Sequence, residues 1–571
     1  MEIITERIDD VPLIIGVARK LGIASLVDKH IGNHGSQKGL SNGELLVGWL
    51  AYMLSQGDHK KSGVQDWAND LKETLGGLFG KPLRDIDFSD DRLSNITRRF
   101  SIDKKWQELE GALWDGTVSV YDPSMICIRL DSTSSYGYHK VTEDGFMQFG
   151  VSKDHRPDLP QLKLMAGCCQ PGGHLIGVDI HPGNRADDPL YVPLIQRIRN
   201  VLKKAGMLYS GDCKMSSIET RAEVVSHGDY YLTPLGLTGK TGKEYEEWVN
   251  AVVIGTQPVE CLYYGDKLLG MGYEFVREQE AVLNGKDMKW LERVQIIRSP
   301  KLAHSKSENL EKRLSKAAEA LFRLTPEPGK GKRQIKEQNK LDNAIEDLLV
   351  RNKVEGLLKV KWQEVKSKKT RYKGQGRGGA NREKVEEEHV RYKITEVVRD
   401  EEAIMEVKNR FGWRAHVTNA PSDKLNLSQS VICYRQGNII ERDFHLLKDT
   451  PIGIGPLYVW KEEQIKGLTR ILTLALRLLT LIEIQVREGI KKEGEPMKGL
   501  YEGQPNRVTD KPTGRRILKA FARAKVTLTD VNTGDTIHRH ISPLSTLHHR
   551  ILLYLKLPAS IYTELSYDNS T

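Results

Sequence analysis

The strongest constraint on the fold lies between residues 120 and 236, where strand-like apolar runs alternate with amphipathic helical stretches. Three strand-like runs come first, and the second and third are joined at Pro171-Gly172-Gly173 as in a hairpin. A helix, a strand, a second helix and a fifth strand follow. The order β-β-β-α-β-α-β predicts an α/β domain in which the first and fourth strands are neighbours.

Both of these strands lead to an aspartate. RLDSTSS places Asp131 at the end of the first strand, and YSGDCKM places Asp212 at the end of the fourth. Two carboxylates at the ends of neighbouring strands lie close together and repel each other unless a proton or a cation lies between them. Small neighbouring residues leave room for Mg²⁺, a hard ion that prefers oxygen ligands. We therefore predict a metal site here, which a third acid on a helix would complete as a two-metal site for displacement at phosphorus.

The stretch YRQGNIIERDFHLLK supplies a third acid. On one helix Tyr434, Glu441 and Lys448 are seven residues apart and share a face. We expect Glu441 to point at the metal ions, with Tyr434 and Lys448 flanking it to contact DNA phosphates. For any single acid, an amphipathic helix with an exposed carboxylate is the simpler interpretation. Three acids in this order favour the catalytic one.

At these residues the chain resembles insertion-sequence transposases of the DDE type. The resemblance is to the group with a tyrosine–arginine–glutamate–lysine signature in the IS-four-like assemblage, in the branch with a long N-terminal helical region. Tyr434, Glu441 and Lys448 match the signature, whereas its arginine position holds Gly437. The stretches FGVSKDHRPDLPQLKLM and FSDDRLSNI add to the resemblance.

The resemblance implies an RNase H-like catalytic core interrupted by a long insertion. It implies cut-and-paste transposition: cleavage at element ends and strand transfer into target DNA, with two Mg²⁺ ions that Mn²⁺ can replace. The expected partners are double-stranded DNA, as terminal inverted repeats and as target, and a second copy of the chain in the DNA complex. The expected location is the prokaryotic cytoplasm, at the nucleoid and not in a membrane. The predicted DNA contacts are Tyr434, Lys448, Arg435, Arg442, Lys153 and Arg156.

Changes in pattern along the chain predict five regions. They are a helical N-terminal domain for binding DNA ends (1–115), the first part of the core (116–236), an insertion with a flexible basic loop at Lys366–Gly379 (237–425), the second part of the core with the catalytic helix (426–490), and a C-terminal region for DNA binding or dimerisation (491–571).

Composition is consistent with this interpretation. There are 86 Lys and Arg against 76 Asp and Glu, a net charge of +10, which favours a polyanionic partner. Six cysteines without a CxxC pair indicate core residues in a reducing compartment. The apolar run LTRILTLALRLLTLIEIQV contains Arg470, Arg477 and Glu483, so it is predicted to be a buried helix with a polar stripe and not a membrane span.

Two other functions stay open. Gly437 at the arginine position would suit a DNA-binding protein of the same fold that has lost its chemistry. GLTGKT would suit a nucleotide-driven enzyme, but the first glycine of that motif would fall at Pro234. GQGRGG also fits a dinucleotide-binding pattern and is interpreted as a loop. Three tryptophans are candidates for holding a displaced base, although packing is the simpler role for each: Trp290, Trp362 and Trp413.

Overall fold

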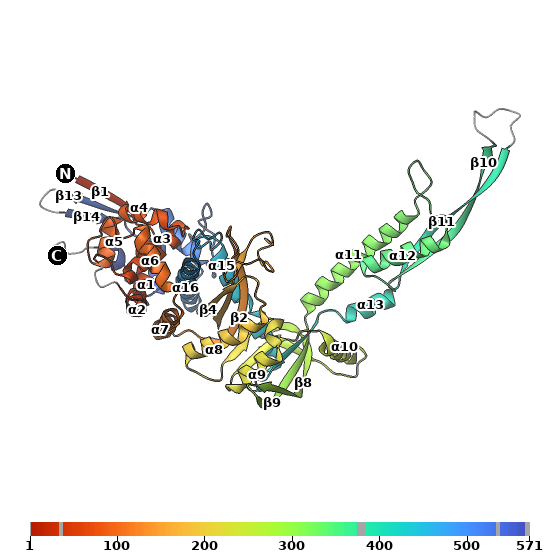
Figure 1. Cartoon of the computed structure of the whole chain (residues 1–571), viewed down its shortest axis with the longest axis horizontal. Helices are drawn as coiled ribbons and strands as arrows, with labels where there is room; N and C mark the ends of the chain where they lie inside the picture. Colours follow the sequence, from red (N-terminus) through yellow and green to blue (C-terminus); the bar gives the residue numbers. More distant parts are fainter. Residues whose placement is uncertain (1, 34–37, 374–383, 533–536, 566–571) are drawn as a thin grey trace.

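The computed structural model describes residues 2–33, 38–373, 384–532 and 537–565. Figure 1 shows an elongated molecule with three parts. A mainly helical body carries both ends of the chain, a twisted sheet lies in the middle, and a long arm projects from the far side of the sheet.

The central sheet contains nine strands within the described residues, in the order β4-β3-β2-β5-β6-β12-β9-β8-β7. β2 pairs antiparallel with β3 and parallel with β5, so the predicted adjacency of the first and fourth strands is confirmed. The strands are β2 (Met125–Tyr136), β3 (Gln161–Pro171), β4 (Leu175–Pro182), β5 (Leu208–Ser210), β6 (Tyr230–Pro234), β7 (Glu260–Tyr264), β8 (Lys267–Leu283), β9 (Lys286–Arg298) and β12 (Trp413–Thr418).

Helices cover both faces of this sheet, as the alternation along β3 shows. Met165 packs into the cluster that contains Ile198 of helix α8, whereas Leu164 and Ala166 pack into the cluster that contains Phe444 of helix α15. Successive strand residues point to opposite faces, so the run from Leu164 to Cys169, which is buried on both faces, has no polar side chain apart from its thiols. The helices in these two layers are α8 (Tyr191–Leu202) and α9 (Ile218–Ser226) on one side, and α15 (Asn438–Lys448) and α16 (Glu462–Glu493) on the other.

Helix α16 is the predicted buried helix with a polar stripe. Its arginines reach acids on helix α7 (Asp103–Tyr121): Arg470 pairs with Asp103, and Nη2 of Arg477 lies 2.5 Å from Oε1 of Glu110. These pairs let a very apolar helix carry charge inside the protein. In the part of the chain that the structure describes, no helix is long and apolar enough to cross a membrane.

The body joins the two ends of the chain. Strand β1 (Glu2–Arg7), in a region expected to be helical, pairs antiparallel with β13 (Thr527–Asn532), which also pairs with β14 (Ile537–Ile541). Helices of both terminal regions pack around this small sheet and α16. They are α1 (Val11–Lys20), α2 (Ile23–His30), α3 (Asn42–Gln56), α4 (Val64–Asn69), α5 (Lys72–Phe79), α6 (Asp90–Phe100), α17 (Gly514–Ala524), α18 (Thr546–Tyr554) and α19 (Ser560–Thr563).

The segment 237–425 contributes to two parts of the structure, the central sheet and the arm. After helix α10 (Gly239–Val253), its strands β7, β8, β9 and β12 extend the central sheet. The rest forms the arm: α11 (Pro300–Leu324), α12 (Gln338–Asn352), the paired strands β10 (Leu358–Tyr372) and β11 (Lys384–Arg399), and α13 (Glu401–Asn409).

The basic stretch in this segment was predicted to be a loop from Lys366 onward, and this is wrong for its first part. Residues 366–372 belong to β10, and Nζ of Lys368 lies 3.4 Å from Oε2 of Glu386 on β11. Lys368 lies directly across from Glu388, and Lys369 from Glu387, and opposite charges in such cross-strand pairs stabilise a strand despite its poor apolar content. GQGRGG lies outside the described residues.

Candidate active site

Asp131 and Asp212 lie next to each other at one edge of the pairing between β2 and β5. That pairing ends at Arg129 and Ser210, and each aspartate follows two residues later. Asp131 is not at the end of its strand as predicted, because β2 keeps pairing with β3 as far as Tyr136. The end of β5, and not the end of β2, exposes its carboxylate.

The second aspartate is fixed by two hydrogen bonds. Oδ1 of Asp212 accepts from the backbone N–H of Lys214 at 2.9 Å, which caps the short 3₁₀ helix Cys213–Ser216. The same oxygen accepts from the hydroxyl of Tyr191 on α8 at 2.6 Å. The carboxylate is therefore held by the start of one helix and by the helix layer behind the sheet.

The surroundings of Asp131 raise the pKa of its carboxyl group. Burial raises its pKa, the nearby ammonium of Lys153 and the backbone N–H of Ser132 lower it, and the negative charge of Asp212 raises it further. Nζ of Lys153 lies 3.6 Å from Oδ1 of Asp131 and 3.7 Å from Oδ2 of Asp187. Two repelling carboxylates with a cation beside them are a donor set that fits a hard divalent ion.

Glu441 is carried by α15, in the helix layer on the other side of the sheet from α8. Helix α15 packs on β2 and β3, with Ile440, Phe444 and Leu447 buried and Glu441 exposed. Among the described residues, no hydrogen bond or ion pair is formed by the Glu441 carboxylate, and no group of three or more His, Cys, Asp or Glu lies close enough to hold a metal ion. The structure brings the two aspartates together and leaves Glu441 outside that pair.

The expected single helix from residue 434 to residue 448 is instead two helices. α14 (Leu427–Arg435) carries Tyr434, and α15 starts at Asn438 after a turn at Gln436 and Gly437. Tyr434 is half-buried, with its ring centroid 4.4 Å from that of His416 and 5.0 Å from Cζ of Arg129. The tyrosine therefore packs against the sheet.

Lys448, at the end of α15, is tied to the loop after β2. Its Nζ lies 2.5 Å from Oδ1 of Asp154. The neighbouring Lys153 donates to the backbone oxygen and the hydroxyl of Ser132 at 2.6 and 2.7 Å. One dipeptide thus pairs with a predicted metal ligand through its lysine and with a predicted DNA contact through its aspartate.

Comparison with known proteins decides the family. A family model for the transposase DDE domain matches residues 123–478, more than half of the chain, and the match includes Asp131, Asp212 and Glu441. The chain belongs to the transposase DDE domain family. A cryo-EM structure of the piggyBac transposase synaptic complex with hairpin DNA is similar at 8% identity and a TM-score of 0.36, covering 98% of this chain and 86% of that one. No curated protein sequence matches.

Three further predicted DNA contacts of this transposase, besides Lys153 and Lys448, also have partners in the protein. Arg435 donates to the backbone oxygen of Leu269 at 2.7 Å. Nη2 of Arg156 lies 2.7 Å from Oδ2 of Asp158, and both side chains are at the surface. The guanidinium of Arg442 donates to Asp443 at 2.8 Å and to the backbone oxygen of Gly172 at 3.2 Å, and it also lies 3.4 Å from Glu483.

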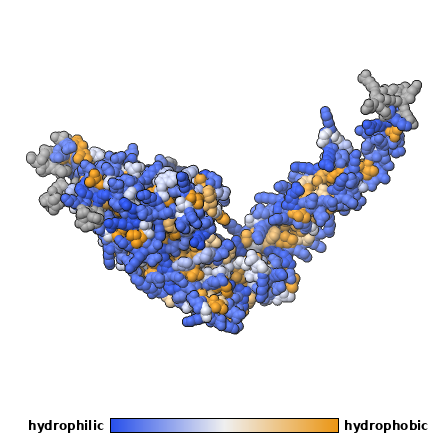
Figure 2. Space-filling model, viewed as in Figure 1, coloured by the Kyte–Doolittle hydropathy of each residue, from blue (hydrophilic) through white to orange (hydrophobic). Residues whose placement is uncertain are grey.

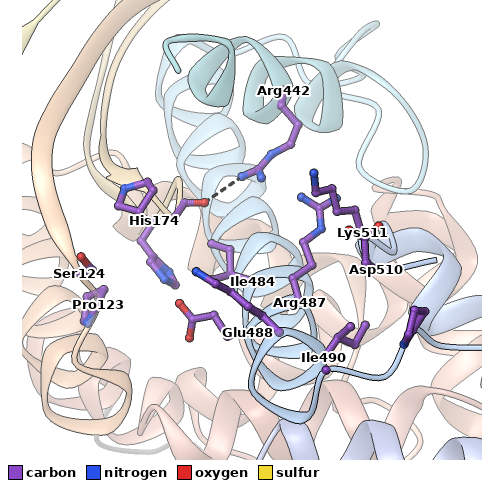
Figure 3. A pocket seen from close by; sticks show the side chains of 15 residues that line it. Pro123, Ser124, His174, Arg442, Ile484, Arg487, Glu488, Ile490, Asp510 and Lys511 are labelled. Atoms are coloured by element: carbon purple, nitrogen blue, oxygen red, sulfur yellow. Dashed lines mark hydrogen bonds between the residues drawn. The ribbon is translucent and has the colours of Figure 1, made fainter. Parts of the chain in front are cut away.

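Arg442 also lines a cavity of about 570 Å³ at the other end of β2, shown in Figure 3. Pro123 and Ser124, which precede β2, form part of its wall. Asp131 lies six positions along the strand from Met125, about 20 Å at the rise of a β-strand. We therefore leave Arg442 out of the DNA contacts proposed below.

The three candidate tryptophans are engaged in packing. Nε1 of Trp290 donates to the hydroxyl of Tyr231 at 2.9 Å, and Nε1 of Trp413 donates to the backbone oxygen of Asn409 at 3.2 Å. Trp362 lies edge-on to Tyr392 in the arm, with the ring centroids 5.2 Å apart. These contacts agree with the simpler role that the sequence favours for each.

Sequence reasoning missed one residue of the site, Arg129. It is buried beneath Tyr434 and Gly437. The signal was available, because Arg129 precedes Asp131 by two residues and so points to the same face of β2. A charged residue in the middle of a buried strand also needs a reason to be there.

Proposed function

We propose that this transposase cuts DNA at the ends of its element and joins those ends to target DNA by a cut-and-paste route. The observation that carries the proposal is the parallel pairing of β2 with β5, which sets Asp131 and Asp212 side by side beyond Ser210. The order β4-β3-β2-β5-β6, with β2, β5 and β6 parallel, supports an RNase H-like core for this half of the sheet.

Proteins of this family generally use divalent metal ions, and we propose two Mg²⁺ ions held by Asp131, Asp212 and Glu441. Bound there, the ions would activate a water or a 3′-hydroxyl and stabilise the leaving oxygen at phosphorus. The residues of the chain provide oxygen ligands and a fixed spacing between them. The raised pKa of Asp131 means that a cation must favour its ionised form, as Lys153 already does in part. Glu441 would complete the set from α15, whose exposed face carries it.

The DNA would run past the same edge of the sheet. We propose Lys448 and Arg156 as cations that contact the DNA backbone. In this structure they pair with Asp154 and Asp158, and DNA phosphates would have to replace these carboxylates. Lys153 would turn from Asp131 to the phosphodiester when metal binds. We propose terminal inverted repeats and target duplex as the substrates, a homodimer in the DNA complex, and action at the prokaryotic nucleoid.

The test is metal-dependent cleavage of a duplex that carries the inverted repeat flanking the coding sequence. Asp131→Asn keeps the size of the side chain and removes its charge, so we expect a loss of cleavage on the order of 10³-fold in Mg²⁺ or Mn²⁺. Asp266→Asn, in the exposed turn between β7 and β8, is the matched control and should cleave normally. Full activity of the Asp131 variant would exclude the proposed site.

A DNA-binding protein without chemistry is the second candidate. It is favoured by one observation: among the described residues, Glu441 is not gathered with the aspartates into a metal-holding group. The same assay separates the two functions. Specific binding of the repeat by the wild-type chain, with no cleavage in either metal, would favour the second.

A further inference from the structure

Gly437 lies in the turn between α14 and α15, and the space beside it is already filled. A Cβ atom at this position would lie 2.5 Å from Cζ of Arg129 and 2.7 Å from its Nη2. Real Cβ atoms essentially never approach other heavy atoms this closely. The φ angle of Gly437 is −61°, which any residue adopts, so a larger residue would not strain the backbone but would force the end of the Arg129 side chain to shift.

The guanidinium of Arg129 is held from three sides. Its Nη1 donates to the hydroxyl of Ser210 at 3.0 Å, and Ser210 is also its register partner on β5. Its Cζ lies 5.0 Å from the ring centroid of Tyr434, within the range of a cation–π contact. Gly437 closes the third side. One side chain thus joins both aspartate-bearing strands to the two helices behind them.

This placement is costly for Arg129. The residue is 8% exposed, and its Nε has no hydrogen-bond partner. Among the described residues, no carboxylate lies within 4.0 Å of it as an ion-pair partner. Burying a cation without such a partner costs several kcal/mol, so a chain retains one where the position of the charge matters.

We propose that Arg129 is a positioning residue that takes the place of the signature arginine. The signature arginine would stand at position 437, in the turn before α15. This chain supplies the guanidinium from β2, two residues before Asp131, and keeps residue 437 a glycine to admit it. Through Tyr434 and the turn at Gly437, Arg129 sets the depth and rotation of α15 and therefore the position of Glu441. The inference rests on the proposed function.

The experiment compares two single variants with their combination. Arg129→Gln removes the guanidinium, and Gly437→Ala displaces it without changing it. We expect each to slow cleavage of the inverted-repeat duplex by about 100-fold at saturating DNA and metal, because misplacing a catalytic group by about 1 Å costs that much. The affinity for the duplex, measured without metal, should change less than threefold. A general loss of structure would lower affinity and rate together.

Coupling between the two sites is the decisive readout. Because both substitutions disturb one contact, the double variant should be no slower than the slower single variant. Moving the guanidinium to position 437, with Arg129→Ser and Gly437→Arg together, should recover at least tenfold over Arg129→Ser alone. Wild-type cleavage by Arg129→Gln, or effects of the two substitutions that multiply, would overturn the proposal.

Arg293→Gln is the control, because Arg293 is also 8% exposed but lies on β9, held by the backbone oxygens of Ala420 and Leu425 and by an ion pair with Glu274. It should lower the melting temperature without coupling to Gly437→Ala. If the wild-type chain does not cleave, the proposed function fails. The same double-variant cycle in melting temperature then still tests the contact, and additive shifts would show that Arg129 and Gly437 do not interact. If Arg129→Gln does not fold, the cleavage rates of Gly437→Ala and of the double variant Arg129→Ser, Gly437→Arg still test the proposal.

Discussion

At the scale of single residues, the charged side chains proposed to bind metal and DNA are paired with charges of the protein itself. Lys153 supplies a positive charge beside Asp131, where a metal ion is proposed, and Asp154 supplies a negative charge beside Lys448, where a phosphate is proposed. The two residues are adjacent in one loop. Metal and DNA would therefore each displace one half of the same dipeptide, and binding of one should ease binding of the other.

Asp154→Asn should tighten DNA binding. The change removes the partner of Lys448 and one negative charge, so we expect affinity for duplex DNA without metal to rise several-fold at low salt and the gain to shrink as salt is added. Fluorescence anisotropy over a salt series measures both. Asp144→Asn removes an equal charge from an exposed position in the same loop. An equal gain in DNA affinity in the Asp144 variant would show that net charge, and not the release of Lys448, causes the effect.

Asp10 should make the protein less stable as pH rises. Burial raises its pKa from 3.8 to about 7, while a hydrogen bond from the hydroxyl of Ser55 lowers it in part. Between about pH 4 and pH 7 the folded chain keeps this proton and the unfolded chain loses it, so the free energy of unfolding falls across that window. In Asp10→Asn, a contribution on the order of 3 kcal/mol to that fall should vanish. Urea unfolding at pH 4.5 and 7.5 measures it, and an unchanged pH dependence would show that Asp10 ionises normally.

At the scale of elements, the sequence pattern predicted those helices, strands and turns that depend on neighbouring residues alone. The strands from Met125 to Pro234, the hairpin at Pro171 and the buried helix α16 follow from apolar period and turn residues. Adjacency of Asp131 and Asp212 followed from strand order. The break at Gly437 did not, because it depends on the Arg129 side chain arriving from another element.

Strand pairings between distant segments could not be predicted, because the sequence around each strand does not indicate its partner. The addition of β12 beside β6 and the pairing of β1 with β13 join stretches far apart in the chain, so neither could be read from a sequence window. The strand at Lys366–Tyr372 has the composition of a loop. It is a strand because the acidic run Glu386–Glu388 lies across from it.

The junction between α7 and α16 should depend on its buried charges. Glu110 has a fully buried side chain and pairs with both Arg477 and Arg197. Arg477→Met should destabilise the fold by about 3 kcal/mol, because it leaves Glu110 with one partner in place of two. Adding Glu110→Gln should recover part of that loss. Chemical denaturation measures both variants, and a loss that grows in the double variant would mean that packing dominates over charge.

At the scale of the whole molecule, the arm stands away from the body across an open notch, and most of its visible surface is hydrophilic in Figure 2. The loop between α11 and α12 rises from the arm in Figure 1. It forms a concave site of about 680 Å³ rich in cations. Those cations are Arg323, Lys332, Arg333, Lys336 and Lys340. Arg323 and Lys340 pair with nearby glutamates, which leaves the loop's own basic residues for an external anion.

Neutralising that loop should weaken DNA binding in a salt-dependent way. In the triple variant Lys332→Gln, Arg333→Gln, Lys336→Gln, each lost phosphate contact should reduce the slope of log affinity against log salt by about 0.9. Affinity at low salt should fall while the melting temperature stays constant, because all three side chains are exposed at the arm surface. Titration of the inverted-repeat duplex at four salt concentrations measures the slope.

The control for the arm variant removes the same charge elsewhere, with Lys204, Lys267 and Lys286 changed to Gln at exposed positions outside both terminal regions. Long-range attraction depends on net charge and should fall equally in both proteins. Counterion release depends on direct contact, so only the arm variant should change the slope. Equal slopes in the two triple variants would mean that the arm does not touch DNA. A reduced slope in the arm variant alone would extend the DNA path from the aspartates of the sheet across the notch to the arm.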